Sequence, residues 1–241
     1  DVMDAVGSNI RVDTYGWEVK RILPKINEDI NEEWISDKTR YACDGLKNQR
    51  IDTPFIRNGK KFNKISWNEA YKILKTKTEN INPDKIGCFI GDLTNMETSY
   101  AAKELISKTF KSNLYESRSD SYYVNFEEKQ NYIFNSSISG IEESDLILIV
   151  GCNPRLEATI LNSRIRKSYL KSKLPIYSTN DIGNQTYPYK VLENSTNLIK
   201  EIIESKNELS EKIVKSSKPI IIIGQSVLKL KSGQFVFEEL K

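Results

Sequence analysis

Asp145-Leu-Ile-Leu-Ile-Val-Gly-Cys-Asn-Pro154 is the stretch that decides the fold of this chain. Leu146 to Val150 is an unbroken aliphatic run, short enough for a strand and apolar on both faces, as a central strand of a parallel sheet is. Gly151 tolerates positive φ, and Asn153-Pro154 is typical of a helix N-cap followed by proline in the first turn. The stretch therefore predicts a strand, a tight turn and a helix, and open α/β sheets hold ligands at such turns.

The same order of aliphatic run, glycine, polar turn and helix recurs at Ile90-Gly91 and at Ile223-Gly224. This alternation predicts an α/β fold with a doubly wound, mostly parallel sheet and helices on both faces. Between these strands, Ser66 and Glu69 are spaced as a capping box, which predicts a helix to about Asn80. The apolar face of that helix would carry Trp67, Ala70, Tyr71 and Leu74.

The first 50 or so residues differ from the rest of the chain in their pattern of polar and apolar residues. Residues 9–13 and 18–23 alternate or cluster like short strands with a turn between them. We therefore expect two domains, a small β-rich domain over residues 1–52 and a Rossmann-like α/β domain over residues 53–241. Because the chain opens without methionine at Asp1, we also expect it to be a fragment of a longer polypeptide.

Composition excludes several function classes. The chain has 241 residues, 38% of them hydrophobic and 29% charged, which is typical of a soluble globular protein. A formal charge of +3 is too small to argue for nucleic acid, and no apolar run approaches the roughly 20 residues that span a bilayer. The absence of histidine excludes Ser-His-Asp triads and His-ligated zinc. Cys43, Cys88 and Cys152 are far apart, which predicts no disulfide framework and a reducing compartment.

The turn after the central strand lacks the usual nucleotide-binding signatures. It has no second glycine for a pyrophosphate, and no GK[ST] follows. A structural turn is the commoner role for such a sequence. A nucleotide-binding module with its ligand at Gly151 to Asn153 remains open as an alternative.

Four stretches share one resemblance. They are Asn9-Ile10, Asn31-Glu-Glu-Trp-Ile-Ser-Asp-Lys38, residues 140–154 and Lys218-Pro-Ile-Ile-Ile-Ile-Gly224. Together they resemble the molybdopterin oxidoreductase superfamily. Residues 1–10 and 28–40 are more closely similar to one branch of it, the large iron-sulfur subunits of respiratory NADH:quinone oxidoreductase (complex I). The resemblance implies a small 4Fe-4S-type domain followed by a molybdopterin-oxidoreductase-like domain.

The departures from the family pattern concern the cofactors. The resemblance implies four cluster ligands spaced C-x2-C-x3-C, with a fourth cysteine further on, and these positions are Asp1, Asp4, Ser8 and Ser36. None is cysteine, and iron-sulfur clusters need thiolates, so we expect no cluster in these residues. Cys43 alone cannot replace four ligands.

The molybdenum site also departs from the pattern. Residues 116–124, where the family's metal ligand is expected, contain no cysteine. An active molybdopterin-dependent oxidoreductase would have to use Ser119 or Asp120 as its metal ligand. Asp181 lies near the place of the family's acidic guanosine-binding residue. We expect Gly151 and Asn153 to be the remains of the cofactor loop, with no pterin bound.

From these departures we expect a structural domain that has no cofactor and catalyses nothing alone. The resemblance implies the following for the intact subunit. The intact subunit would carry 2Fe-2S and 4Fe-4S clusters in an N-terminal region and relay electrons from NADH to quinone. Its partners would be the other peripheral-arm subunits of complex I, with no nucleic acid and no direct membrane insertion. The complex would hold it peripherally at the cytoplasmic face of the bacterial inner membrane, or on the matrix side in mitochondria.

Overall fold

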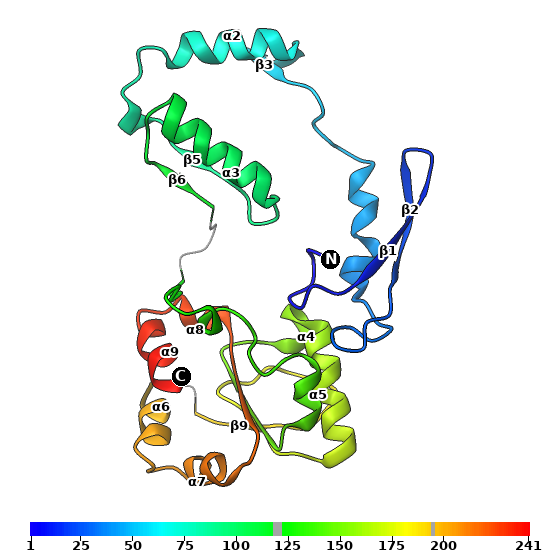
Figure 1. Ribbon diagram of the computed structural model, residues 1–241, viewed down its shortest axis with the longest axis vertical. Coiled ribbons are helices and arrows are strands. Elements are labelled where there is room, and N and C mark those ends of the chain that lie inside the picture. The colour runs from blue at the N-terminus through cyan, green and yellow to red at the C-terminus, as the bar shows by residue number, and fades with distance from the viewer. Residues whose placement is uncertain (118–121, 194–195) are drawn as a thin grey trace. The chain divides into compact units, whose positions relative to one another are not determined.

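The computed structural model describes residues 1–117, 122–193 and 196–241 (Figure 1). The chain divides into two compact units. The larger unit comprises Asp1–Asp44 and Ser121–Lys241, and the smaller unit comprises Gly45–Asp120. The expected division into domains at residues 52 and 53 stays a prediction.

A four-stranded parallel sheet is the centre of the larger unit. Its strand order is β10-β7-β8-β9, with β7 at Leu146–Val150, β8 at Ile176–Ser178, β9 at Lys190–Val191 and β10 at Pro219–Ile223. All three neighbouring pairs are parallel. The mixed α/β class with a parallel sheet is therefore confirmed, and every residue of β7 is buried, as its aliphatic run predicts.

Helices cover both faces of this sheet. Ile147 and Ile149 of β7 share a core cluster with Ile165 of α5, whereas Leu148 packs with Leu198 of α6 on the opposite face. Each of these buried aliphatic side chains stabilises the fold by about 1.5–3 kcal/mol. The helical elements that the structure describes in the C-terminal part of the unit are η4 Lys129–Asn131, η5 Ser139–Glu143, α4 Pro154–Glu157, α5 Thr159–Ser172, α6 Thr196–Ile203, α7 Glu208–Lys215, α8 Gln225–Leu228 and α9 Gly233–Leu240.

The N-terminal region of the larger unit contains the predicted pair of short strands. β1 (Ile10–Tyr15) and β2 (Glu18–Pro24) form an antiparallel hairpin, and α1 (Asp37–Tyr41) and η1 (Ala42–Leu46) follow it. The side chain of Asn31 holds the intervening loop together. It is buried, accepts a hydrogen bond from Asn9 N at 2.8 Å, and donates to the carbonyls of Lys25 and Trp34 at 3.2 and 3.1 Å.

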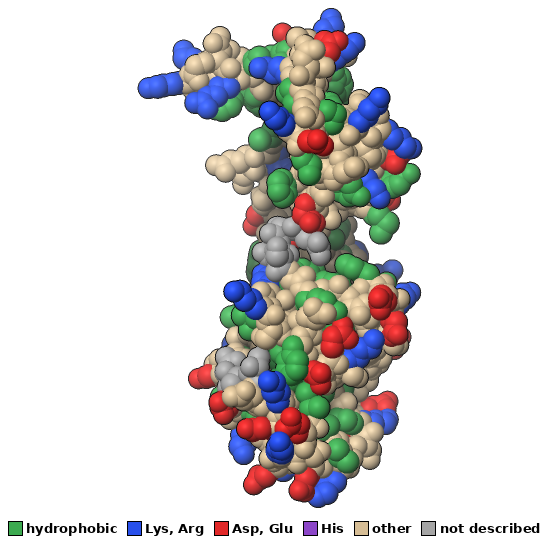
Figure 2. All heavy atoms as spheres, turned by 90° about the vertical axis from the view of Figure 1, so that its left-hand side faces the viewer, with side chains coloured by type: hydrophobic (Ala, Val, Ile, Leu, Met, Phe, Trp, Pro, Cys, Tyr) green, Lys and Arg blue, Asp and Glu red, His purple; other side chains and the backbone are tan. Residues whose placement is uncertain are grey.

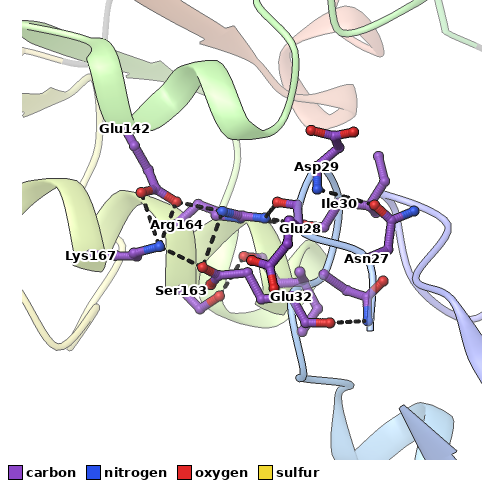
Figure 3. Close-up of polar contacts among 11 residues, drawn as sticks. Asn27, Glu28, Asp29, Ile30, Glu32, Glu142, Ser163, Arg164 and Lys167 are labelled. Atoms are coloured by element: carbon purple, nitrogen blue, oxygen red, sulfur yellow. Dashed lines mark hydrogen bonds and ion pairs between the residues drawn. The ribbon is translucent and has the colours of Figure 1, made fainter. Parts of the chain in front are cut away.

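A buried arginine joins this N-terminal region to the sheet (Figure 3). The side chain of Arg164, on α5, is only 3% exposed and donates from Nε to Ile30 O at 3.3 Å and from its other nitrogens to Glu28 O and Glu142. Lys167 also bridges Glu142, at 3.0 Å. Burial opposes ionisation of Glu142, yet the hydrogen bonds from Arg164 and Lys167 hold its pKa below the ordinary value. The buried positive charge is thus matched by a carboxylate and by backbone oxygens.

The smaller unit contains the β3 (Phe55–Asn58) and β4 (Lys61–Lys64) hairpin, and β5 (Cys88–Phe89) paired in parallel with β6 (Tyr115–Glu116). Its helical elements are α2 Trp67–Thr78, η2 Pro83–Lys85, α3 Met96–Glu104 and η3 Leu105–Thr109.

The predicted helix at Ser66 is confirmed as α2, because Ser66 Oγ accepts from Glu69 N at 3.2 Å. α2 buries none of its residues, and Trp67, on the predicted apolar face, is 58% exposed. Periodicity predicts which residues share a face, but a packing partner comes only from tertiary structure.

Over the sheet-bearing unit, Figure 2 shows acidic and basic side chains interspersed on the face that holds α6 and α9. No helix among the described residues is both long and apolar enough to cross a membrane.

Candidate cofactor sites

The four positions that the resemblance assigns to cluster ligands lie in one hydrogen-bonded group. Thr39 links two of them: its hydroxyl donates to the carboxylate of Asp1 and lies 2.9 Å from Ser36 Oγ. Ser36 is also the N-cap of α1, because its Oγ accepts from Thr39 N at 3.2 Å. The start of one short helix therefore brings residues 38 positions apart into contact.

Asp4 and Ser8 form the other half of the group. Ser8 Oγ donates to Asp4 Oδ2 at 2.9 Å, and Val6 N donates to Asp4 Oδ1 at the same distance. The backbone nitrogen of Asp1 donates to Ser8 O at 3.1 Å. Ser8, Ser36 and Thr39 are all buried, so these contacts are shielded from water.

The chemistry of this group does not fit an iron-sulfur cluster. Its donors are hydroxyl and carboxylate oxygens already bonded to one another, whereas a 4Fe-4S cluster is held by cysteine thiolates. Cys43, the only cysteine in residues 1–44, is buried, and its Sγ lies 3.8 Å from Arg40 O. Sequence reasoning found the four positions but missed Thr39, for which the spacing from the N-cap Ser36 was the available signal.

The second candidate site is the turn at the carboxyl end of β7. The chain runs from β7 to β8 and β9 and then returns to β10 on the other side of β7, so the crevice between β7 and β10 is the topological switch point. The turn that follows β7 and the turn that follows β10 are in contact here. A Cβ on Gly151, whose φ is 62°, would lie 2.6 Å from Val227 Cβ, and a Cβ on Gly224 would collide with Cys152.

Asn153 is used by the protein itself. It caps α4, accepting from Leu156 N at 3.4 Å, and its Nδ2 donates to Ile182 O at 3.0 Å. Its Oδ1 also accepts from Gln185 Nε2 at 3.0 Å. The side-chain amide that sequence reasoning assigned to a residual cofactor loop therefore ties the β7 turn to the segment between β8 and β9.

Gln185, which sequence reasoning missed, closes this turn. The residue is only 1% exposed, and its Oε1 accepts from Arg155 N at 3.1 Å. Its carbonyl accepts from Asn162 Nδ2 at 3.3 Å, and Tyr187 donates to Asn162 Oδ1 at 2.7 Å. No local pattern identifies this glutamine as a buried residue, because all of its partners except Ile182 lie 23 to 32 residues away.

The two titratable side chains near the turn differ in their charge. Burial raises the pKa of the Cys152 thiol to about 12, and the Glu157 carboxylate adds to the effect, so the metal-binding thiolate is disfavoured. Asp181 already accepts from Gly183 N at 2.9 Å and from the Tyr189 hydroxyl at 2.7 Å, and these bonds lower its pKa.

The alternative molybdenum ligands, Ser119 and Asp120, lie outside the described residues. Within residues 1–117, 122–193 and 196–241, no three or more His, Cys, Asp or Glu side chains are grouped so that they could hold a metal ion.

Comparison with known proteins places both regions in families. Residues 50–241 match the molybdopterin oxidoreductase family model, and residues 1–44 match the model of the NADH-ubiquinone oxidoreductase NDSU1/NuoG-like 4Fe-4S domain. The chain is 44% identical to the mitochondrial NADH-ubiquinone oxidoreductase 78 kDa subunit of Candida albicans, over 99% of this chain and 33% of that protein. It is 42% identical to the 75 kDa subunit of Reclinomonas americana, over 100% of this chain and 37% of the relative.

A bacterial relative gives the same result. The chain is 39% identical to an NADH-quinone oxidoreductase subunit of Rickettsia bellii, over 98% of this chain and 34% of that protein. The chain thus spans about a third of the length of these relatives. Because the molybdopterin oxidoreductase model matches most of its residues, the chain belongs to the molybdopterin oxidoreductase family.

Proposed function

We propose that this chain is part of the large iron-sulfur subunit of an NADH:quinone oxidoreductase, where it serves as a structural domain without a cofactor of its own. The names of the relatives support the assignment to that enzyme. The structural role rests on one observation: the positions of the four cluster ligands hold oxygen atoms that are already hydrogen-bonded, Asp1 to Ser36 through Thr39 and Ser8 directly to Asp4.

The closed turn after β7 supports the same proposal for the pterin. A pterin dinucleotide at the switch point needs space beside the backbone of both strands. Here Val227 packs against Gly151, and Gln185 and Asn153 bond to each other across the turn. These contacts, together with the oxygen donors at residues 1, 4, 8 and 36, support a domain that holds neither an iron-sulfur cluster nor a pterin.

Electron transfer would then depend on 2Fe-2S and 4Fe-4S clusters elsewhere in the subunit. This chain would pack against that region and against other peripheral-arm subunits of complex I, held at the membrane surface by the complex. The chain alone would be inactive, and its contribution would be a rigid body in which Arg164 fixes the N-terminal region to α5.

Metal analysis tests the proposal. The purified chain should be incubated without oxygen with iron and sulfide, desalted, and assayed for iron, sulfide and molybdenum. We expect less than about one-tenth of an iron per chain, because thiolates are required to hold a cluster. Stoichiometric iron or molybdenum would refute the structural role. Thermal-shift measurements with NADH, ATP and GTP test the nucleotide-binding alternative at Gly151 to Asn153, and a shift of several degrees would favour it.

A further inference from the structure

The outer edge of β10 is an uncovered part of the larger unit. β10 is the end strand of its sheet and pairs only with β7 among the described strands. Its four isoleucines place apolar side chains on both faces, with Ile220 and Ile222 buried. A strand that is apolar on both faces is typical of a sheet interior, and an exposed edge of this kind invites pairing with another strand.

The alternation of the backbone shows which groups are free at this edge. Gly224 N donates to Val150 O at 2.8 Å, so the even-numbered residues of β10 direct their backbone groups toward β7. The N–H groups of Ile221 and Ile223 therefore point away from the sheet. Pro219, also on this side, has no N–H to satisfy, and proline is tolerated at the first residue of a strand.

A groove of about 1130 Å³ lies beside this edge. Isoleucines of β10 form one wall, and aromatic side chains that include Tyr122, Phe134 and Phe237 form others. Asn131 also lines the groove, and both polar atoms of its side-chain amide are buried without a hydrogen-bond partner. An unpaired amide needs one acceptor and one donor, which a backbone peptide group supplies.

The topology indicates where a following strand would pair. The crossover from β7 to β8 runs over one face through α5, and the return from β9 to β10 runs over the other face through α6 and α7. α9, which follows β10, packs beside α6 on that second face, and Val236 shares its core cluster. Because crossovers between parallel strands are right-handed, a crossover through α9 continues in the same direction, past β10.

We propose that the outer edge of β10 binds a further parallel strand, contributed by the polypeptide that follows α9. The strand would carry aliphatic residues at alternate positions, bond to the backbone of Ile221 and Ile223, and present a peptide group to Asn131. The chain covers about a third of the length of its relatives, so each relative has polypeptide outside the matched region from which such a strand can come. The handedness of the α9 crossover favours this source over a second copy or another subunit.

Hydrogen exchange tests the proposal with controls inside the same strand. The amides of Ile221 and Ile223 should exchange at least ~100-fold more slowly in a polypeptide extended to the length of the relatives than in the 241-residue chain, because pairing removes them from water. The amides of Ile220 and Ile222, which face β7, should be protected in both. Equal exchange of Ile221 and Ile223 in the two polypeptides would overturn the proposal.

Asn131→Leu gives an independent test, because its effect should change sign. Leucine has a similar shape and leaves no unpaired polar atom, so the variant should raise the Tm of the 241-residue chain. In the extended polypeptide it would remove the partner of a peptide group and should lower the Tm. An effect of one sign in both would contradict the proposal. So would protection that depends on protein concentration or on added subunits, since these indicate a second copy or another chain.

Discussion

The N-terminal group of Asp1, Asp4, Ser8 and Ser36 and the turn at Gly151 depart from a cofactor site in opposite ways. In the N-terminal group the four positions of the cluster ligands lie together, but their side chains offer oxygen atoms and not the sulfur atoms of a cluster site. The second keeps the sequence features of a cradle, a glycine at φ 62° and a capped helix start, but Val227 lies close against its glycine.

The difference follows from how each cofactor is held. An iron-sulfur cluster is bound through side-chain atoms, so replacing the thiols removes the bonds whatever the backbone does. A pterin or nucleotide at a strand-turn-helix is held largely by backbone groups and needs room beside them. Remote side chains such as Gln185 and Val227 can fill that room while the turn itself is unchanged.

Restoring the four thiols should produce the largest effect. The combined variant Asp1→Cys, Asp4→Cys, Ser8→Cys and Ser36→Cys should bind about four irons per chain after anaerobic loading, because its backbone already groups these positions. Iron and sulfide analysis with absorption spectroscopy measures this, with the unmodified chain as control. A folded variant that takes up no iron would show that more than donor chemistry separates this region from a cluster site.

The second prediction tests whether the two sites belong to one folded body. Arg164→Met removes the buried guanidinium that bonds Glu142 and two backbone carbonyls, leaving Glu142 only its contact with Lys167, and should lower the free energy of unfolding by about 3–5 kcal/mol. Lys167→Met is the matched control, since Lys167 is half exposed, and should cost at most ~1 kcal/mol. Denaturant unfolding measures both. Equal losses would mean that Arg164 does not join the N-terminal region to α5.

The third prediction concerns the space at the β7 turn. Gly151→Ala forces a Cβ toward Val227 and requires positive φ, so it should cost about 2–4 kcal/mol. Gly183→Ala has a similar φ of 69° but nothing within 4 Å of its Cβ, and should cost only about 1–2 kcal/mol. If chemical denaturation gave the same loss for both, close packing of Val227 against Gly151 would be refuted.

Asn153→Ala should have a smaller effect on stability. It removes a helix cap and the hydrogen bonds to Ile182 and Gln185, so we expect a loss of about 1–2 kcal/mol. Thermal unfolding of the chain, together with assembly and electron transfer of the complex, separates packing from cofactor binding. Altered electron transfer in a stable, fully assembled complex would contradict a purely structural role for Asn153.

The smallest expected effect is the pH dependence of the Arg164 joint. The pKa of Glu142 lies below its ordinary value of 4.5 in the folded chain, so the unfolded state binds protons first as pH falls. The stability from this carboxylate is present above about pH 4.5 and is lost as pH falls through the lower folded pKa. Arg164→Met should flatten this part of the curve, and an unchanged slope would exclude the joint as its cause.

Sequence reasoning predicted the parallel sheet because its signals are local. Five consecutive buried aliphatic residues identify β7, and Asn153-Pro154 and Ser66 mark the helix starts that the structure confirms. It could not predict that Trp67 and its neighbours on α2 would be exposed. Amphipathicity sets the face of a helix, but not what meets it.

The amino-acid sequence by itself determined the donor chemistry: without thiols at residues 1, 4, 8 and 36, no fold of this chain can supply four cysteine ligands there. Only the tertiary structure decided that Thr39 links Asp1 to Ser36 and that Gln185 reaches Asn153. The physical reason is the separation along the chain of the residues that interact. Atom types and short-range backbone preferences are set by neighbouring residues, whereas the filling of space depends on segments that folding brings together from far along the chain.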